Sequence, residues 1–151
     1  MLMESLLAYA HIAAILMLVV FVTGEAALCR PEWLNAAIVR RLNRLDALYL
    51  VSAVLVLLTG LARTWWGLKG WGWYWSQPLL HAKVSVFVLV ALMSIKPTRQ
   101  FRRWRRELDL TGALPPETEI RAVRHRIMVQ THLLVLVPLA ATLLARGVWT
   151  R

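Results

Sequence analysis

The chain has 151 residues, of which 59% are hydrophobic, and it carries a net charge of +10. A soluble domain usually contains about 45–50% apolar residues, so the composition excludes an ordinary soluble protein and indicates a membrane protein. The basic residues stand between long apolar runs, which argues against a nucleic-acid partner. The single cysteine, Cys29, excludes an intramolecular disulfide and a cysteine metal cluster, and we expect it to be an unreactive thiol near the membrane surface.

Four apolar runs predict four transmembrane helices, because about twenty apolar residues are needed to cross the hydrocarbon core. The predicted helices cover residues 6–28, 46–62, 79–95 and 127–145. The first run is too long for the core of a signal peptide, and no cleavage pattern follows it, so we expect it to be retained. The four helices predict an all-α, up-down-up-down bundle that forms a single transmembrane domain over residues 1–151.

The segments between these runs also have recognisable character. Residues 35–45 are expected to be helical and to lie along the second helix or continue into it. Five of the eight tryptophans lie within residues 63–78, which predicts a tryptophan-rich outer cap at the level of the lipid headgroups. Lys96-Pro97 is expected to end the third helix. Residues 99–108 then predict a basic surface helix whose aromatic side chains face lipid.

The distribution of basic residues predicts the orientation. The linker after the first helix holds four lysines and arginines and the loop after the third holds nine. The aromatic loop and the C-terminal tail hold two each. By the positive-inside rule, the aromatic cap and both termini lie outside. In a bacterium, this places the protein in the inner (cytoplasmic) membrane with both termini periplasmic.

Two histidines are predicted at similar depth near the outer surface, His11 on the first helix and His81 at the start of the third. Two neutral imidazoles that face each other across a bundle can bind a haem iron, so both are candidate metal ligands. Alternatively, each histidine hydrogen-bonds a neighbouring helix or a headgroup. Residues two apart on a helix point about 200° apart, so His81 and Lys83 cannot both face one point. One is then a ligand while the other meets a propionate, a quinone oxygen or an acid, unless the lysine extends to the membrane surface.

A second group of polar residues is predicted in the inner half of the bundle. Glu25 lies near the inner end of the first helix, and His132 lies under two turns into the fourth. Asp46 and Arg44 open the second helix on the same side. These residues are candidates for a proton path or a second cofactor site. The alternative is a layer of interfacial ion pairs that caps the helix ends, with Asp46 favoured by the helix dipole.

Arg63 and Lys69 are the cations of the aromatic loop. They are candidates to bind a propionate or a phosphate, or else to form cation–π pairs with the neighbouring tryptophans. The sequence has no glycine-rich nucleotide loop, cysteine pair or serine nucleophile elbow. Redox chemistry would therefore depend on a bound haem, porphyrin or quinone.

Several short motifs resemble those of the CopD-like group of small bacterial membrane proteins, which includes the HemJ-type protoporphyrinogen oxidases. The matching pieces are Ala10-His11, Arg40-Arg41-Leu42, Gly60, Leu80-His81-Ala-Lys83 and Arg102-Arg-Trp-Arg. Closer likeness to an uncharacterised four-helix family of this group is found in Gly60-Leu-Ala-Arg63, Lys69-Gly70, Leu92-Met-Ser-Ile-Lys-Pro97-Thr98 and Ala145-Arg146-Gly147. The resemblance implies haem b and electron transfer from protoporphyrinogen IX to a quinone, with His11 and Lys83 matching a histidine and a lysine on which those enzymes depend.

The sequence thus favours a haem b-binding inner-membrane redox protein that holds one or two haems and exchanges electrons with the quinone pool. If it is an enzyme, it is an oxidoreductase, with Lys83 and Glu25 as the candidate catalytic residues. The alternative is a non-enzymatic membrane module, either a metal- or haem-handling protein or a partner subunit. Small residues such as Gly60 and Ala53 also leave a homodimer open.

Overall fold

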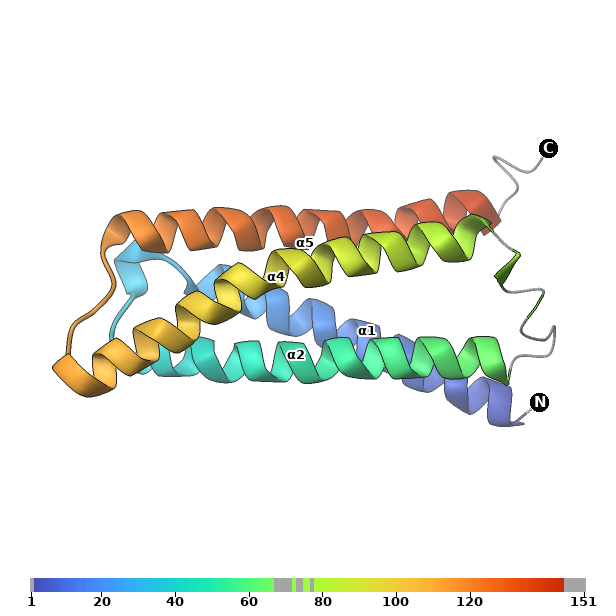
Figure 1. Ribbon diagram of the computed structural model, residues 1–151, viewed down its shortest axis with the longest axis horizontal. Helices are drawn as coiled ribbons and strands as arrows, with labels where there is room; N and C mark the ends of the chain where they lie inside the picture. Colours follow the sequence, from blue (N-terminus) through green and yellow to red (C-terminus); the bar gives the residue numbers. More distant parts are fainter. Residues whose placement is uncertain (1, 67–71, 73–74, 77, 146–151) are drawn as a thin grey trace.

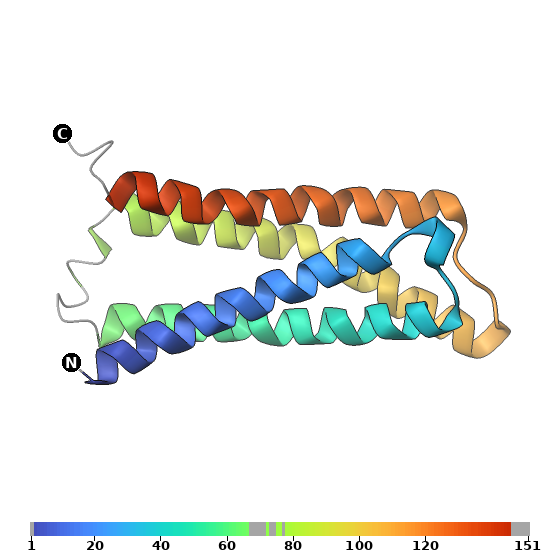
Figure 2. The same ribbon diagram turned by 180° about the vertical axis from the view of Figure 1, so that it is seen from behind.

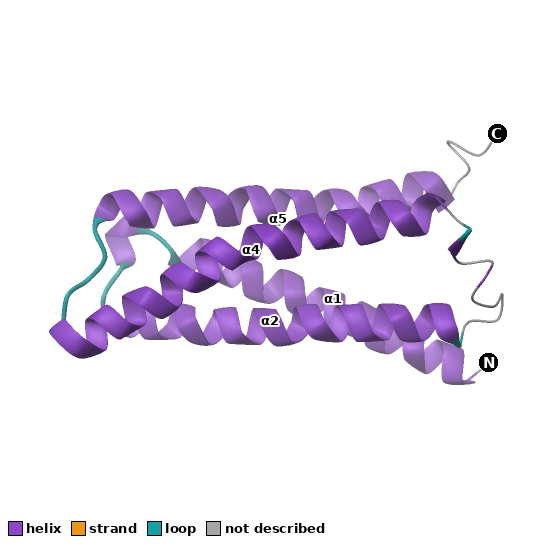
Figure 3. Ribbon diagram, in the orientation of Figure 1, coloured by secondary structure: helices purple, strands orange, loops and turns teal. Residues whose placement is uncertain are grey.

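Four long helices form an elongated bundle in the computed structural model, which describes all residues except 1, 67–71, 73–74, 77 and 146–151 (Figure 1). The helices are α1 (Leu2–Leu28), α2 (Ala36–Trp65), α4 (Pro78–Thr111) and α5 (Glu117–Ala145), with a short 3-10 turn, η1 (Pro31–Trp33), after α1. No strand occurs in the described part of the chain, as the colouring of Figure 3 shows. The all-helical class predicted from the sequence is confirmed.

The helices run alternately up and down. The start of α1, the end of α2, the start of α4 and the end of α5 all lie at one end of the bundle, which we call the outer end (Figure 1). The connections from α1 to α2 and from α4 to α5 lie at the opposite, inner end. Each helix packs against two neighbours: α1 against α2 and α5, and α4 against α2 and α5. Seen from behind, α1 runs obliquely, from beside α2 at the outer end towards α5 at the inner end (Figure 2).

Among the described residues, three helices are long and apolar enough to cross a membrane, namely α1, α2 and the part of α4 from Leu80 onwards. This confirms a helical membrane bundle in contact with lipid. The fourth predicted span, 127–145, lies within α5, and most of its side chains beyond Leu136 are outside the described residues. The four-span count therefore stays a prediction.

The second helix begins ten residues before the start of its predicted span. Its N-cap is Asn35, whose Oδ1 accepts a hydrogen bond of 3.0 Å from the Ile38 backbone N–H. An asparagine cap of this kind satisfies one of the backbone donors left open in the first turn. Residues 35–45 therefore continue into the second helix, the second of the two arrangements considered for them. Likewise, α5 begins at Glu117, directly after Pro115-Pro116, and not at residue 127.

The predicted end of the third helix at Lys96-Pro97 is wrong. Pro97 lies inside α4, which continues to Thr111 and ends where Gly112 adopts a positive φ of 72°. The predicted lipid-facing positions of the aromatic side chains in 99–108 are wrong as well, because Phe101 and Trp104 are both fully buried. Burial of two large aromatic side chains stabilises the helix beyond the proline by several kcal/mol, about the same size as the cost of a proline in a helix.

The apolar core lies in the inner half of the bundle. Its largest members are Trp104, Phe101, Leu42 and Ile127, which are fully buried between α2, α4 and α5. Cys29 joins this core between α1 and η1, with its Sγ–H directed at the Ile120 carbonyl at 3.9 Å. Burial raises the pKa of the Cys29 thiol to about 12, which disfavours the reactive thiolate. The expected unreactive thiol is consistent with this position.

The Glu119 carboxylate links the inner ends of α4 and α5. Glu119, in the first turn of α5, accepts a hydrogen bond of 3.1 Å from Trp104 Nε1 and forms an ion pair with Arg103. Gln100 donates to the same oxygen at 3.4 Å. The Trp104 hydrogen bond, and after it Arg103, hold the pKa of Glu119 below its usual value. The carboxylate form of Glu119 therefore stabilises the folded state.

We expect Glu119→Gln to lower the stability of the protein in detergent by about 1 kcal/mol at neutral pH. Because the pKa of Glu119 is lowered in the folded state, its contribution is present above the ordinary glutamate pKa of about 4.3 and is lost as the pH falls below it. Thermal unfolding across this range should show that wild type and variant converge on acidification. Glu117→Gln is the matched control, since Glu117 is exposed and pairs only with Arg121 on its own helix among the described contacts. Equal effects of the two substitutions would contradict the role of Glu119.

Candidate functional site

His11 is held against α2 in the outer half of the bundle. The His11 ring is half-buried, and its Nδ1 lies 2.8 Å from Thr59 Oγ1. The Thr59 hydroxyl donates its one proton to the Leu55 carbonyl at 2.6 Å, so it accepts a hydrogen bond from His11 Nδ1–H. The proton of the neutral imidazole is thereby placed on Nδ1, and the lone pair is on Nε2. A histidine oriented in this way by a second residue is competent to bind a metal through Nε2.

Gly60, the next residue on α2, makes room for this ring. A Cβ atom at position 60 would lie 3.2 Å from His11 Cε1, which is tighter than almost all real contacts of a Cβ atom. The close helix contact expected at Gly60 is thus an approach of the α1 imidazole to the α2 backbone. Even an alanine at this position would require the His11 ring to shift by a few tenths of an ångström.

Two exposed cations lie within electrostatic range of His11. Arg63 on α2 and Lys83 on α4 both interact electrostatically with the imidazole, and they also act on each other. Lys83 reaches this level because α2 and α4 run antiparallel and are fixed in register by a hydrogen bond of 2.7 Å from Thr98 to Asp46. Lys83 precedes Thr98 by the same number of residues as Leu61 follows Asp46. The two antiparallel helices therefore bring Lys83 to the level of Leu61. We call His11, Thr59, Arg63 and Lys83 the outer cluster.

His81 lies outside the outer cluster. Its ring is exposed, and its Nε2 donates a hydrogen bond of 2.8 Å to the Trp75 carbonyl. The two rings also meet edge-to-face, with centroids 5.8 Å apart. His81 is two residues, about 3 Å along the axis, further out than Lys83, and points to another side of α4. Of these two residues, only Lys83 acts electrostatically on His11, and the similar depth of His81 stays a prediction.

The remaining predicted ligands are separate from this cluster. His132 is exposed, and its Nδ1 donates to the Met128 carbonyl one turn earlier on α5, at 2.6 Å. Gln130, two residues before His132, bonds Tyr49 on α2. Tyr49 lies ten residues deeper than Thr59, the partner of His11. His132 is therefore about 12 Å deeper than His11. Lys69 lies outside the described residues.

A layer of buried polar side chains joins all four long helices in the inner half. We call it the buried polar layer, and it consists of Glu25 on α1, Asp46, Tyr49 and Ser52 on α2, Ser94 and Thr98 on α4, and Gln130 on α5. Besides the Thr98–Asp46 bond, Gln130 Nε2 donates to the Tyr49 hydroxyl at 2.6 Å. Ser94 Oγ donates to the Ala91 carbonyl on its own helix at 2.7 Å. Such bonds satisfy polar groups that would otherwise be costly inside a membrane protein.

Glu25 is the exception within this layer. Its side chain is 3% exposed, and its Oε1 has no hydrogen-bond partner among the described residues. Asp46 lies near enough to interact with it electrostatically. A buried carboxyl oxygen without a partner is uncommon and favours a functional role over a structural one.

The structure therefore changes the composition predicted for the inner group. Glu25 and Asp46 come together, but His132 is exposed and does not join them. The interfacial ion pair considered for Asp46 and Arg44 is wrong, because Asp46 is buried and bonded to Thr98 while Arg44 is exposed. The hydroxyl groups of Tyr49, Ser94 and Thr98 were missed. Their signal was polar residues at helical spacing inside apolar runs, in register with Asp46.

The long apolar helices, the outer cluster and the buried polar layer define a small polytopic helical membrane protein. The chain belongs to the family described as "Predicted membrane protein (DUF2214)", which it matches over residues 3–149. No curated protein matches the chain. No solved structure matches it either. Membrane localisation thus follows from the family as well as from the helices, and the resemblance to the CopD-like group stays a prediction.

We expect Tyr49→Phe to destabilise the bundle by about 1–3 kcal/mol, because it removes the hydroxyl that Gln130 bonds and leaves a buried amide unsatisfied. The apparent free energy of unfolding in mixed micelles measures the effect. Tyr9→Phe is the matched control, since Tyr9 is 73% exposed and should tolerate the same change. Equal stability of the two variants would show that the Tyr49–Gln130 bond does not hold α2 and α5 together.

Proposed function

We propose that this protein binds haem b in the bacterial inner membrane and exchanges electrons with the quinone pool, in the manner of a HemJ-like oxidoreductase. The observation that supports the proposal best is the outer cluster. It contains the His11 imidazole, which has a lone pair on Nε2. It also contains two cations from different helices, Arg63 and Lys83. Imidazole is a common iron ligand, and cationic side chains suit the propionates of a haem.

The donor set fits this group. Among the described residues, no cluster of three or more His, Cys, Asp or Glu side chains is suited to hold a bare metal ion. A haem needs only one or two protein ligands, because its macrocycle supplies the others. His11 would be the first ligand. His81 would be the second, through Nδ1, because Nε2 donates to Trp75; its exposed ring lies outside the outer cluster and would have to turn towards His11 to share one iron. His132 is the alternative, through Nε2.

The other residues have separate roles in the proposal. Bound haem iron would supply one-electron transfer between its ferrous and ferric states. Arg63 and Lys83 would bind propionates or the oxygens of a substrate, and Lys83 is the candidate catalytic residue among them. Glu25 would hold the proton that accompanies quinone chemistry, at the carboxyl oxygen that has no partner among the described residues. A buried acid beside a second acid suits proton exchange.

The proposal includes four membrane spans with both termini in the periplasm. Thirteen lysines and arginines lie in the two inner connections and the adjoining parts of α2, α4 and α5, against four in the aromatic loop and the C-terminal tail. The two inner connections lie at one end of the bundle (Figure 1), so the bias applies to a single membrane surface.

We expect an alkaline phosphatase fused after Arg151 to be active and a green fluorescent protein fused there to be dark when it is exported by the general secretory route. Both readouts report a periplasmic C-terminus. The reverse result would place the outer cluster at the cytoplasmic surface or reduce the number of spans to three. Fusions after Thr111, in the inner connection, serve as the internal control with the opposite expectation.

We expect the protein, purified after expression with ample haem supply, to show a Soret band, and His11→Ala to lose it or to change from a low-spin to a high-spin spectrum. His125→Ala is the matched control, because His125 is exposed at the inner end.

Lys83→Ala should keep the spin state and lower turnover with a quinone. Retention of the low-spin spectrum in His81→Ala, with its loss in His132→Ala, would assign the second ligand to His132. A colourless wild-type protein would contradict the proposal and favour a haem-free membrane module or partner subunit.

A further inference from the structure

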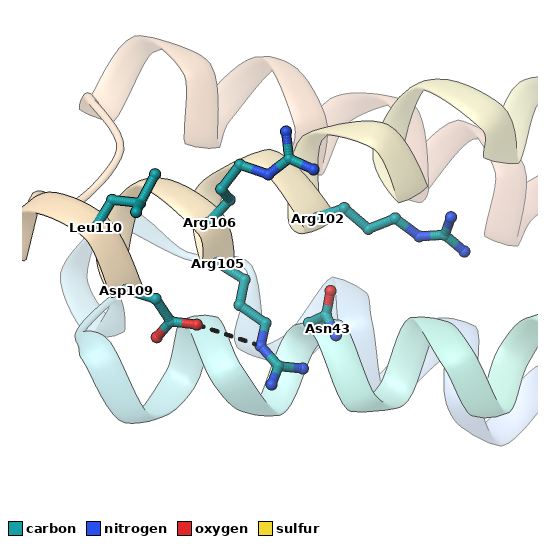
Figure 4. A pocket seen from close by; sticks show the side chains of 6 residues that line it. All are labelled: Asn43, Arg102, Arg105, Arg106, Asp109 and Leu110. Carbon is teal, nitrogen blue, oxygen red and sulfur yellow. Dashed lines mark ion pairs between the residues drawn. The ribbon is translucent and has the colours of Figure 1, made fainter.

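A basic groove lies between the inner parts of α2 and α4. Its volume is about 370 Å³, and its lining consists of Asn43, Arg102, Arg105, Arg106, Asp109 and Leu110. Figure 4 shows the guanidinium groups of Arg102 and Arg105 extending from α4 on the side of α2, where Asn43 lies. Three arginines against one aspartate leave two positive charges in the lining. The groove therefore offers a site for an anion.

The charges of the groove are only partly neutralised by the protein. Asp109 pairs with Arg40 at 3.3 Å and with Arg105 at 3.7 Å, so its carboxylate is shared between two arginines. Arg102 and Arg106 form no ion pair in the described part of the chain, although Arg102 acts electrostatically on the buried Asp46. Two guanidinium groups thus remain for an external ligand with acceptor oxygens. Arginine binds phosphate through paired charge-assisted hydrogen bonds, and an amide such as Asn43 adds a further donor.

The depth of the groove indicates which phosphate it meets. The apolar run of α4 ends at Ile95, and exposed Lys96 follows it. Arg102 lies seven residues beyond Ile95, about 10 Å along the helix axis. The headgroup zone is about 5–8 Å thick on each side of the bilayer, and an arginine side chain can reach back towards it. Arg102, whose side chain extends back, therefore reaches the headgroup level of the inner surface, where anionic lipids attract basic segments. Arg106 lies eleven residues, roughly 16 Å, beyond Ile95, so the groove extends from the headgroups towards the aqueous side.

We propose that this groove binds the phosphate of an anionic glycerophospholipid in the inner leaflet. The proposal does not depend on haem or on any redox activity. The lipid phosphate would neutralise Arg102 and, once its side chain turns, Arg106, whose guanidinium extends away from α2 in Figure 4. It would also connect the inner ends of α2 and α4, which the Arg40–Asp109 pair already bridges at the surface.

The test uses the full-length protein in a neutral detergent, with phosphatidylglycerol or phosphatidylcholine titrated in and bound lipid counted by native mass spectrometry. We expect tighter binding of phosphatidylglycerol, and binding about tenfold weaker in the double variant Arg102→Gln/Arg106→Gln, because two charge-assisted contacts are lost. Neither substitution breaks an ion pair found among the described residues, and helical content and thermal unfolding verify that the double variant folds.

The matched control is Arg41→Gln/Arg126→Gln, which removes the same charge from exposed positions near the inner end that do not line the groove. It should keep the affinity of the wild type. An equal loss in both double variants would overturn the proposal, since binding would then follow net charge alone. Equal affinity for phosphatidylcholine would overturn it as well. Inorganic phosphate at the same concentration should not displace the lipid, and full displacement would assign the groove to a free anion instead.

Discussion

The hydrogen bonds from Thr98 to Asp46 and from Gln130 to Tyr49 fix the register of this bundle. Apolar faces alone do not specify how far one membrane helix slides along another, because lipid covers an apolar side chain as well as a neighbouring helix does. A buried acid or hydroxyl group, by contrast, requires its partner at one height. These two bonds join α2 to α4 and α2 to α5, so α2 is the helix against which the others are set.

The register of α2 and α4, which is fixed in the inner half, determines which residues lie side by side in the outer half. Counting outward from Asp46 and Thr98 brings Lys83 beside the level of Gly60, where α1 presents His11. Thr59 then settles which ring nitrogen carries the proton, because its own proton is used within α2. The outer cluster is therefore a consequence of packing some distance away. A change in the buried polar layer that shifted α4 by one residue would separate Lys83 from His11 without touching either.

The two ends of the bundle differ in how they are stabilised. The inner end is closed by Trp104 and Phe101, and by Glu119, which connects α4 to α5. Many outer residues are exposed apolar side chains, such as Leu6, Leu57 and Val88, as expected where lipid covers the surface. The inner end also carries most of the positive charge. The bundle therefore combines a closely packed, basic inner end with an outer half whose apolar surface suits lipid and whose one oriented imidazole is His11.

The sequence by itself determined the helical class, the membrane location and the outer position of His11, because these depend on apolar length and on where costly groups stand along the chain. It also indicated Glu25 and Lys83 as unusual, since an ionisable group in an apolar run needs a reason. Only the tertiary structure decided which groups meet. The helix continues through Pro97 because Phe101 and Trp104 are buried beyond it, which local propensity does not reveal. Asp46 bonds Thr98 on α4 and lies near Glu25 on α1 because helices far apart in sequence pack together, which the sequence does not reveal. His81 bonds the Trp75 carbonyl, only six residues away, because the chain turns back just before α4.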